Sequence, residues 1–215
     1  MGVLPGSAAR DIWRGFGVLG ADGVVPVFPS LTVSLPDWIS DFCRPGALFA
    51  TMDDRMSLVI ELARANVIHE SGGPFGAAVF DMETGQILAP GVNLVVSTNA
   101  SLAHAEMLAI AVAGRALESF DLSVRPTELV TSTEPCAMCL GAIPWSGVRR
   151  LVCGARDEDA RRIGFDEGDK PPDWISLLRN RGIEVVQDVA RAEATAVMQE
   201  YARSGGFIYN SGGEE

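Results

Sequence analysis

The pattern of apolar and polar positions predicts strands and helices that alternate along most of the chain. Residues 53–67 combine apolar side chains at helical spacing with an acidic first turn, and residues 189–203 place apolar side chains on one helical face. Short apolar runs bounded by turn residues are typical of strands: residues 75–81, 87–96, 128–131, 150–153 and 182–186. This alternation predicts a layered α/β sheet.

One predicted helix, residues 102–113, is apolar except at His104 and Glu106. A buried carboxylate without a partner is costly, and no basic residue follows on this helix before Arg115. We therefore expect a metal, an ordered water or a substrate proton to be the partner of Glu106. Residues two apart do not share a helical face, so Ser101 is expected to cap the helix and to place His104 in or before its first turn.

A second polar pair, Cys136 and Cys139, has the spacing that brings two sulfur atoms to one side of a helix. Pro135 is expected to begin this helix, and Ser132 or Thr133 to cap it. Thiolates near a helix start face unpaired backbone N–H groups, which lower their pKa and favour metal binding.

Together, His104, Cys136 and Cys139 supply one imidazole and two thiolates. Three protein ligands leave the fourth tetrahedral position open, which is typical of a catalytic zinc, and we expect one Zn²⁺ per chain. Zinc lowers the pKa of a bound water from about 15.7 to about 7, and Glu106 is the predicted catalytic acid and base. A redox Cys-x-x-Cys pair or half of a zinc finger is the alternative for the two cysteines alone.

The two motifs resemble those of the cytidine deaminase superfamily, in which His-x-Glu is followed by Pro-Cys-x-x-Cys. The likeness runs over residues 52–186, and lies in the branch that holds bacterial guanine deaminases and tRNA adenosine deaminases. Three stretches are similar to guanine deaminases in particular: residues 72–77, 91–93 leading to 103–106, and 164–167 followed by 169–171. The resemblance implies a three-layer α/β/α sandwich around a central five-stranded mixed sheet, and a homodimer.

The same resemblance implies four substrate contacts. Asn93 is expected to hydrogen-bond the edge of the base, Phe75 to pack on its ring and Asp166 to add a polar contact. Each has a structural alternative: a strand-end residue that bonds backbone, a core side chain and a turn residue, respectively. Guanine deaminases close a C-terminal segment over a neighbouring subunit's site, and Tyr209 in the apolar tail is expected to do likewise.

Composition favours a globular enzyme that acts on small molecules. The chain has 215 residues, of which 47% are hydrophobic and 21% charged, which is ordinary for a globular protein. Seventeen basic against 28 acidic side chains give a net charge of −11, which disfavours nucleic-acid binding. No apolar run approaches the roughly 20 residues of a membrane span. Four cysteines, two of them assigned to the metal, indicate a reducing, cytoplasmic location.

Two regions differ in composition. Residues 1–50 are rich in Gly, Pro and Val, lie outside the resemblance, and form an N-terminal extension of unknown role. Residues 51–215 are expected to form the zinc-dependent deaminase domain with its C-terminal tail.

The sequence leaves three functional hypotheses open. The first is a hydrolase acting on the cyclic amidine of a free nucleobase, with guanine converted to xanthine and ammonia. The second is a deaminase for another aminated ring: cytosine, a nucleoside such as guanosine, or a specialised metabolite. The third is a tRNA adenosine deaminase or a non-catalytic zinc module. Glu106 disfavours a non-catalytic module, because a structural zinc has no use for an uncoordinated acid.

Overall fold

The computed structural model describes residues 31–209. The chain divides into two compact units, residues 1–34 and 35–215, and the fold below is that of the second unit. Its centre is a five-stranded sheet in the order β2-β1-β3-β4-β5. The strands are β1 (Gly76–Asp81), β2 (Ile87–Val92), β3 (Thr127–Thr133), β4 (Arg150–Ala155) and β5 (Glu184–Val186). β1 runs antiparallel to β2 and β3, whereas β3, β4 and β5 are parallel to one another.

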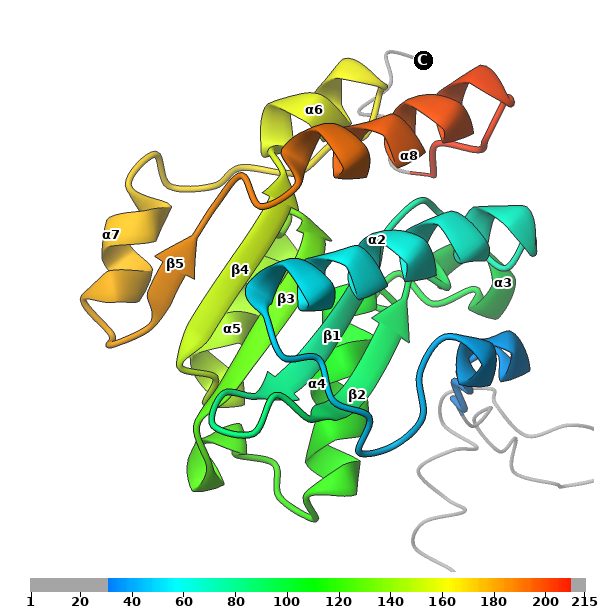
Figure 1. Ribbon diagram of the computed structural model, residues 1–215. Coiled ribbons are helices and arrows are strands. Elements are labelled where there is room, and N and C mark those ends of the chain that lie inside the picture. The colour runs from blue at the N-terminus through cyan, green and yellow to red at the C-terminus, as the bar shows by residue number, and fades with distance from the viewer. Residues whose placement is uncertain (1–30, 210–215) are drawn as a thin grey trace, which may run out of the picture. The chain divides into compact units, whose positions relative to one another are not determined.

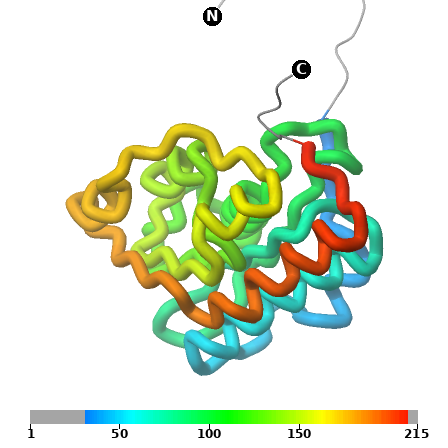
Figure 2. Tube along the Cα trace, turned by 90° about the horizontal axis from the view of Figure 1, so that it is seen from above, coloured from blue at the N-terminus to red at the C-terminus, as the bar shows by residue number. Residues whose placement is uncertain are grey.

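Helices cover both faces of this sheet (Figure 1). On one face α2 (Met52–Ile68) lies beside α8 (Arg191–Arg203), as the view in Figure 2 also shows. On the other face α4 (Ala105–Ala116) packs on β2 and β1 and contacts α5 (Ala137–Ser146). The predicted three-layer sandwich with a mixed five-stranded sheet is therefore confirmed.

Shorter elements complete this unit. Two of them lie against longer elements: α6 (Asp157–Arg162) contacts α8, and α7 (Trp174–Arg179) packs on β5. The others are η1 (Asp37–Asp41), α3 (Val95–Thr98) and η2 (Leu122–Val124). Within residues 31–209 no helix is both long enough and apolar enough to cross a membrane.

Local sequence explains how the two long helices on opposite faces are placed. α2 begins with a capping box: the Thr51 hydroxyl accepts a hydrogen bond from Asp54 N, and the Asp54 carboxylate accepts one from Thr51 N, both at 3.0 Å. α4 approaches β2 closely because position 91 is glycine. A Cβ atom at Gly91 would lie 2.1 Å from the carbonyl oxygen of Ala105, so a larger residue would push the start of α4 off the sheet.

The strand predicted over residues 87–96 is too long by four residues. Val92 pairs with Gly76, the first residue of β1, so the chain beyond it has no partner strand. Leu94 N instead donates to Ala103 O at 2.9 Å, and α3 follows. The apolar residues after Val92 therefore form a turn and a short helix beside the site rather than a strand.

Residues 35–50 pack against the rest of the unit. The indole of Trp38 stacks on the imidazole of His69, with ring centroids 5.2 Å apart and planes 9° from parallel. Trp38 Nε1 also donates to Ser71 Oγ at 3.0 Å, and Leu48 forms a bridge with Gln86. His69 is the C-cap of α2. The predicted extension also includes residues 1–30, which lie outside the described residues.

Candidate active site

The predicted ligands lie at the N-terminal ends of two helices. His104 is itself the N-cap of α4, and Cys136 is the N-cap of α5. The capping predictions were wrong. Ser101 precedes α4 by a separate turn, because His104 N donates to Leu102 O and Leu108 N to His104 O. The side chain of neither N-cap residue accepts a capping hydrogen bond, which leaves both free to face a metal.

The start of α5 also differs from expectation. Ser132 and Thr133 belong to β3, and Ser132 Oγ accepts a hydrogen bond from Gly76 N at 3.1 Å instead of capping a helix. The helix begins at Ala137 rather than at Pro135. The open N–H of Ala137 donates to the carbonyl oxygen of Glu167 at 2.9 Å, so the loop between α6 and α7 caps this helix.

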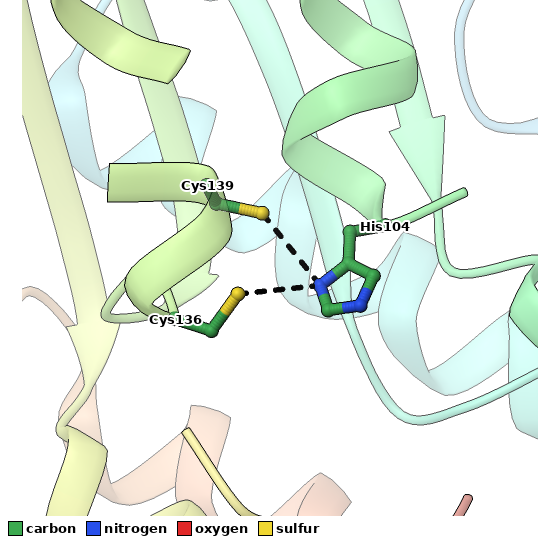
Figure 3. A group of neighbouring side chains, drawn as sticks. All are labelled: His104, Cys136 and Cys139. Carbon is green, nitrogen blue, oxygen red and sulfur yellow. Dashed lines mark hydrogen bonds between the residues drawn. The ribbon is translucent and has the colours of Figure 1, made fainter. Parts of the chain in front are cut away.

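The three predicted ligands come together as one cluster (Figure 3). His104 Nδ1 lies 3.5 Å from Cys136 Sγ and 3.6 Å from Cys139 Sγ, and all three ligand atoms lie within 4.8 Å of one another. Zinc–sulfur bonds of about 2.3 Å and zinc–nitrogen bonds of about 2.0 Å at tetrahedral angles demand separations of this size. The donor set therefore fits one Zn²⁺ with a fourth position left for water or substrate.

The electrostatics of the cluster favour a thiolate at Cys136. A hydrogen bond from Cys139 is the largest cause that lowers the pKa of the Cys136 thiol to about 4, and it outweighs burial; a hydrogen bond with His104 acts in the same direction. Burial disfavours the charged imidazolium of His104, but the hydrogen bond to Cys136 and the charge of Glu106 raise its pKa overall. The Cys136 thiolate thus places one negative charge where the cation would bind, whereas its hydrogen bond with Cys139 and burial raise the pKa of the Cys139 thiol.

Glu106 lies in the first turn of α4, two residues after the ligand. Its side chain is buried, and burial together with the negative charge of Cys136 raises the pKa of the carboxyl to about 7. It lines the same inner pocket as His104 and Cys136 but is not one of the three clustered ligands. A carboxyl beside a metal site, yet outside its ligand set, is placed to accept and donate protons.

Two adjoining pockets open from this cluster. The inner one has a volume of only about 20 Å³. The outer one has about 410 Å³ and shares His104, Cys136, Glu167 and Tyr209 with the inner one. The other residues of the inner pocket are Phe75, Asn93, Glu106, Thr133 and Glu134. The remaining residues of the outer pocket are Val95, Ser101, Ala137, Met138, Asp166 and Gly168.

The predicted substrate contacts lie at different depths. Phe75 and Asn93 line the inner pocket, and the buried Asn93 Nδ2 donates to Tyr209 Oη at 2.8 Å. Phe75 packs edge-on against Phe165, with ring centroids 4.9 Å apart. Asp166 lies at the outer pocket, where its carboxylate accepts from Gly168 N at 2.8 Å and pairs with Arg161.

Tyr209 lies in the site of its own chain. Its ring centroid is 5.3 Å from that of Phe165 and 6.1 Å from that of His104, and its side chain lines both pockets. The aromatic tail predicted to dock therefore docks here, in the single chain, over the metal-binding cluster.

Glu167 is a site residue that the sequence did not single out. It lines both pockets and is buried, and burial together with the charges of Cys136 and Glu106 raises the pKa of its carboxyl to about 8. The stretch 164–167 is similar to guanine deaminases, but residue type gives no reason to prefer Glu167 over the neighbouring Asp166. Only the turn of the loop decides which carboxylate faces inward.

Comparison with known proteins agrees with this geometry. Residues 51–155 match the family model for the cytidine and deoxycytidylate deaminase zinc-binding region. Guanine deaminase from Bacillus subtilis (strain 168) is 41% identical over 108 residues, which cover 50% of this chain and 67% of that protein. The tRNA-specific adenosine deaminase of Buchnera aphidicola subsp. Schizaphis graminum is 32% identical over 155 residues, which cover 72% and 97%.

A solved structure of guanine deaminase from Nitrosomonas europaea is 44% identical and superposes with a TM-score of 0.78, covering 81% of this chain and 97% of its own. The family match spans both zinc-binding helices, and the resemblance stated from the sequence is confirmed. The chain belongs to the cytidine and deoxycytidylate deaminase family of zinc-dependent hydrolytic deaminases.

Proposed function

We propose that this enzyme deaminates a free nucleobase, and that guanine is its substrate, converted with water to xanthine and ammonia. The observation that carries the proposal is the shared inner pocket, in which an acid outside the ligand set (Glu106) and a buried amide (Asn93) face the zinc-ligand cluster. The similarity to two guanine deaminases over most of the catalytic region supports the choice of base.

His104, Cys136 and Cys139 would hold the Zn²⁺, which would make a bound water acidic enough to lose a proton near neutral pH. In this mechanism Glu106 takes one proton from the attacking water and gives it to the ring nitrogen beside the attacked carbon; it then takes the remaining proton from the new hydroxyl group and gives it to the departing amino group. The carbon–oxygen bond forms and the carbon–nitrogen bond breaks, so ammonia leaves. The place of Glu106 beside the cluster and outside the ligand set supports its role as the single proton carrier.

For substrate binding we assign the polar edge of the base to Asn93 and its ring face to Phe75. Asn93 is buried at the end of β2, so its amide is held at one place in the inner pocket. Glu167 adds a buried carboxyl to the same pocket, and Asp166 is placed for a contact at the outer rim. Tyr209 is assigned as the residue that covers the base.

Entry of a base requires the tail to move. The inner pocket, at about 20 Å³, is close to the volume that one water needs and far below that of a purine. Tyr209 lines this pocket and holds Asn93, so withdrawal of its ring is the simplest way to enlarge it. The outer pocket then provides the approach.

A homodimer is part of this proposal. Trp145 on α5, the helix that carries both cysteines, is 86% exposed, and Met138 on the same helix and Leu177 on α7 are also exposed. Exposed apolar side chains gathered in one region mark contact surfaces. Light scattering should find a dimer, Trp145→Glu should shift it to monomer, and the control Phe120→Glu, at another highly exposed aromatic, should not.

We also place the enzyme in the cytoplasm and its catalytic domain at residues 51–215. All four cysteines of the described residues are free thiols, which suits a reducing compartment and leaves two of them available to zinc. Deletion of residues 1–30 should leave activity and zinc content unchanged, and a loss of either would show that the catalytic domain needs this segment.

The test is an ammonia-release assay of the zinc-loaded, full-length protein. Guanine should be turned over with the highest kcat/KM in a panel that contains guanosine, cytosine, adenine, cytidine and tRNA. If another aminated ring is turned over with a higher kcat/KM, that ring is the substrate, and the proposed type of reaction still holds. Turnover of tRNA above that of guanine would overturn the proposal, as would silence across the panel with one zinc per chain.

A further inference from the structure

A buried amide on α2 connects two segments of the active site. Asn66 lies two residues before the end of α2, and its side chain is fully buried. Its Nδ2 atom donates two hydrogen bonds, to Gly73 O and to Asn93 O, each at 2.8 Å. Gly73 belongs to the loop after α2, and Asn93 follows β2, so one side chain joins two segments that are separate in the sequence.

Further backbone contacts restrict the two segments that carry these carbonyl groups. Phe75 N donates to Gly73 O at 2.9 Å, and Asn93 N donates to Phe75 O at 3.1 Å. The loop also lies directly against Asn93, since a Cβ atom at Gly72 would be 1.9 Å from Asn93 O and 3.1 Å from Asn66 Nδ2. The backbones at Gly73, Phe75 and Asn93 are therefore connected, with the Asn66 amide at their centre.

These backbones carry the groups assigned to the base. The side chains of Phe75 and Asn93 both line the inner pocket. A Cβ atom at Gly73 would lie 3.3 Å from Asn93 Oδ1 and 3.5 Å from Tyr209 Cε1, so this loop also forms the wall behind the amide and the tail ring. A shift of either backbone changes where the Asn93 side chain points.

The way Asn66 is bound argues against a purely structural purpose. Among the described residues its Oδ1 atom, although buried, has no hydrogen-bond partner. A buried polar atom without a partner lowers stability, and an apolar side chain at this position of the helix would avoid it. In the part of the chain that the structure describes, only the Nδ2 group of the amide forms hydrogen bonds, and both of them go to the active-site segments.

We propose that Asn66 is a positioning residue, which fixes Asn93 and Phe75 for the base without touching it. The inference rests on the proposed function, because Asn93 is assigned to the substrate there. Asn66 acts through Asn93, so its effect on catalysis disappears when the Asn93 amide is absent. Residues that act as one unit show this non-additive behaviour, whereas a general loss of stability does not.

The test is a double-mutant cycle on the full-length, zinc-loaded enzyme. Asn66→Ala should lower kcat/KM for guanine by about tenfold or more, mainly through KM, because a small displacement of a binding group has effects of this size. In the Asn93→Ala background the same substitution should change kcat/KM less than twofold. Full additivity of the two losses would overturn the proposal. Asn66→Ser, which keeps one donor but is too short to reach both carbonyls, provides a milder variant with an intermediate effect.

A control and a second readout separate this inference from the proposed function. Met56→Ala removes a fully buried side chain ten residues earlier on α2 and should lower stability while leaving kcat/KM unchanged. Amide hydrogen exchange needs no substrate: Asn66→Ala should speed exchange in residues 70–75 and 93–96 but not in the centre of α2. If Asn93→Ala leaves kcat/KM unchanged, the assignment of Asn93 to the substrate is wrong. The hydrogen-exchange measurement then tests by itself whether Asn66 positions the two segments. Unchanged exchange in both segments would refute the positioning role.

Discussion

The hydroxyl of Tyr209 accepts a hydrogen bond from Asn93 Nδ2 at 2.8 Å, and this bond joins residues 116 positions apart in the sequence. The amide assigned to the base is thus already occupied by the protein's own tail. A base that binds Asn93 must replace this hydrogen bond, and the exchange is nearly neutral in energy only if the base offers an acceptor of equal quality. The tail therefore competes with weak ligands for the same amide.

Two substitutions of Tyr209 separate this competition from the proposed covering role. Tyr209→Phe removes the hydroxyl but keeps the ring, so KM for guanine should stay equal or fall by up to about fivefold, the value of one hydrogen bond of about 1 kcal/mol. Tyr209→Ala also removes the ring that packs near Phe165, and KM should rise. Steady-state kinetics of both variants tests this. An equal rise in KM for both would mean that the hydroxyl itself holds the base.

Glu106 and the ligands should differ in what their removal destroys. Glu106→Gln keeps size and burial but removes the proton carrier, so kcat should fall by at least about a hundredfold while zinc stays at one per chain. Cys136→Ala removes a ligand, so zinc and activity should be lost together. Elemental analysis beside the ammonia assay measures both. Near-normal turnover in Glu106→Gln would remove it from the mechanism.

The far end of the sheet holds a buried charge cluster whose loss should affect stability. Glu128 is fully buried and forms ion pairs with Arg55 and with Arg150, the latter at 3.3 Å. Glu128→Ala leaves two guanidinium groups without their shared partner and should lower the free energy of unfolding by about 3–5 kcal/mol. The matched control is Glu184→Ala, at the exposed partner of Arg150, for which about 1 kcal/mol or less is expected. Urea denaturation gives both values.

Acid stability should depend on the contact between α6 and α8. Hydrogen bonds from Arg191 are the largest cause that lowers the pKa of Asp159 to about 2, against an opposing effect of burial. The folded pKa lies below the unfolded value of about 3.9, so the contribution is complete above pH 5 and is lost as the pH falls toward 2. Asp159→Asn should therefore be less stable than wild type at pH 7, with the difference shrinking below pH 4.

Thermal unfolding of the metal-free proteins between pH 7 and pH 3 measures this difference without interference from zinc release. The control is Glu158→Gln, at a more exposed carboxylate that also pairs with Arg191. Its effect should be small at every pH. If Asp159→Asn lowers the thermal stability by the same amount at every pH, the shape of the side chain rather than its charge accounts for the contribution of Asp159.

The zinc ligands and Glu106 could be predicted because the information is local. His104 and Glu106 interrupt an apolar run, and Cys136 and Cys139 share one helical face, so residue type and spacing alone indicate a metal site. The apolar face of the last helix was readable except at its start: Ala194, Val197, Met198 and Tyr201 are buried in α8, whereas Ala190, predicted on the same face, is the N-cap and lies outside the helix. Periodicity reports which face is buried, and that is enough to order strands and helices into layers.

Where elements end depended on their neighbours. The run through residues 93–96 is as apolar as the strand before it, but β1 begins at Gly76 and offers no partner past Val92. The cap of α5 followed the same rule: Ser132 and Thr133 have good capping side chains, yet both belong to strand β3. The local propensity of a segment contains no information on whether a partner strand is available.

The sequence alone determined the zinc-binding chemistry and the layered fold, because both follow from short-range spacing and periodicity. Only the tertiary structure decided which polar side chains share the pocket. It turned Glu167 inward beside Asp166, brought Tyr209 onto Asn93, and placed the Asn66 amide between two loops. Each of these contacts joins distant segments or depends on the direction of one side chain. Tertiary packing determines both which segments meet and where a side chain points.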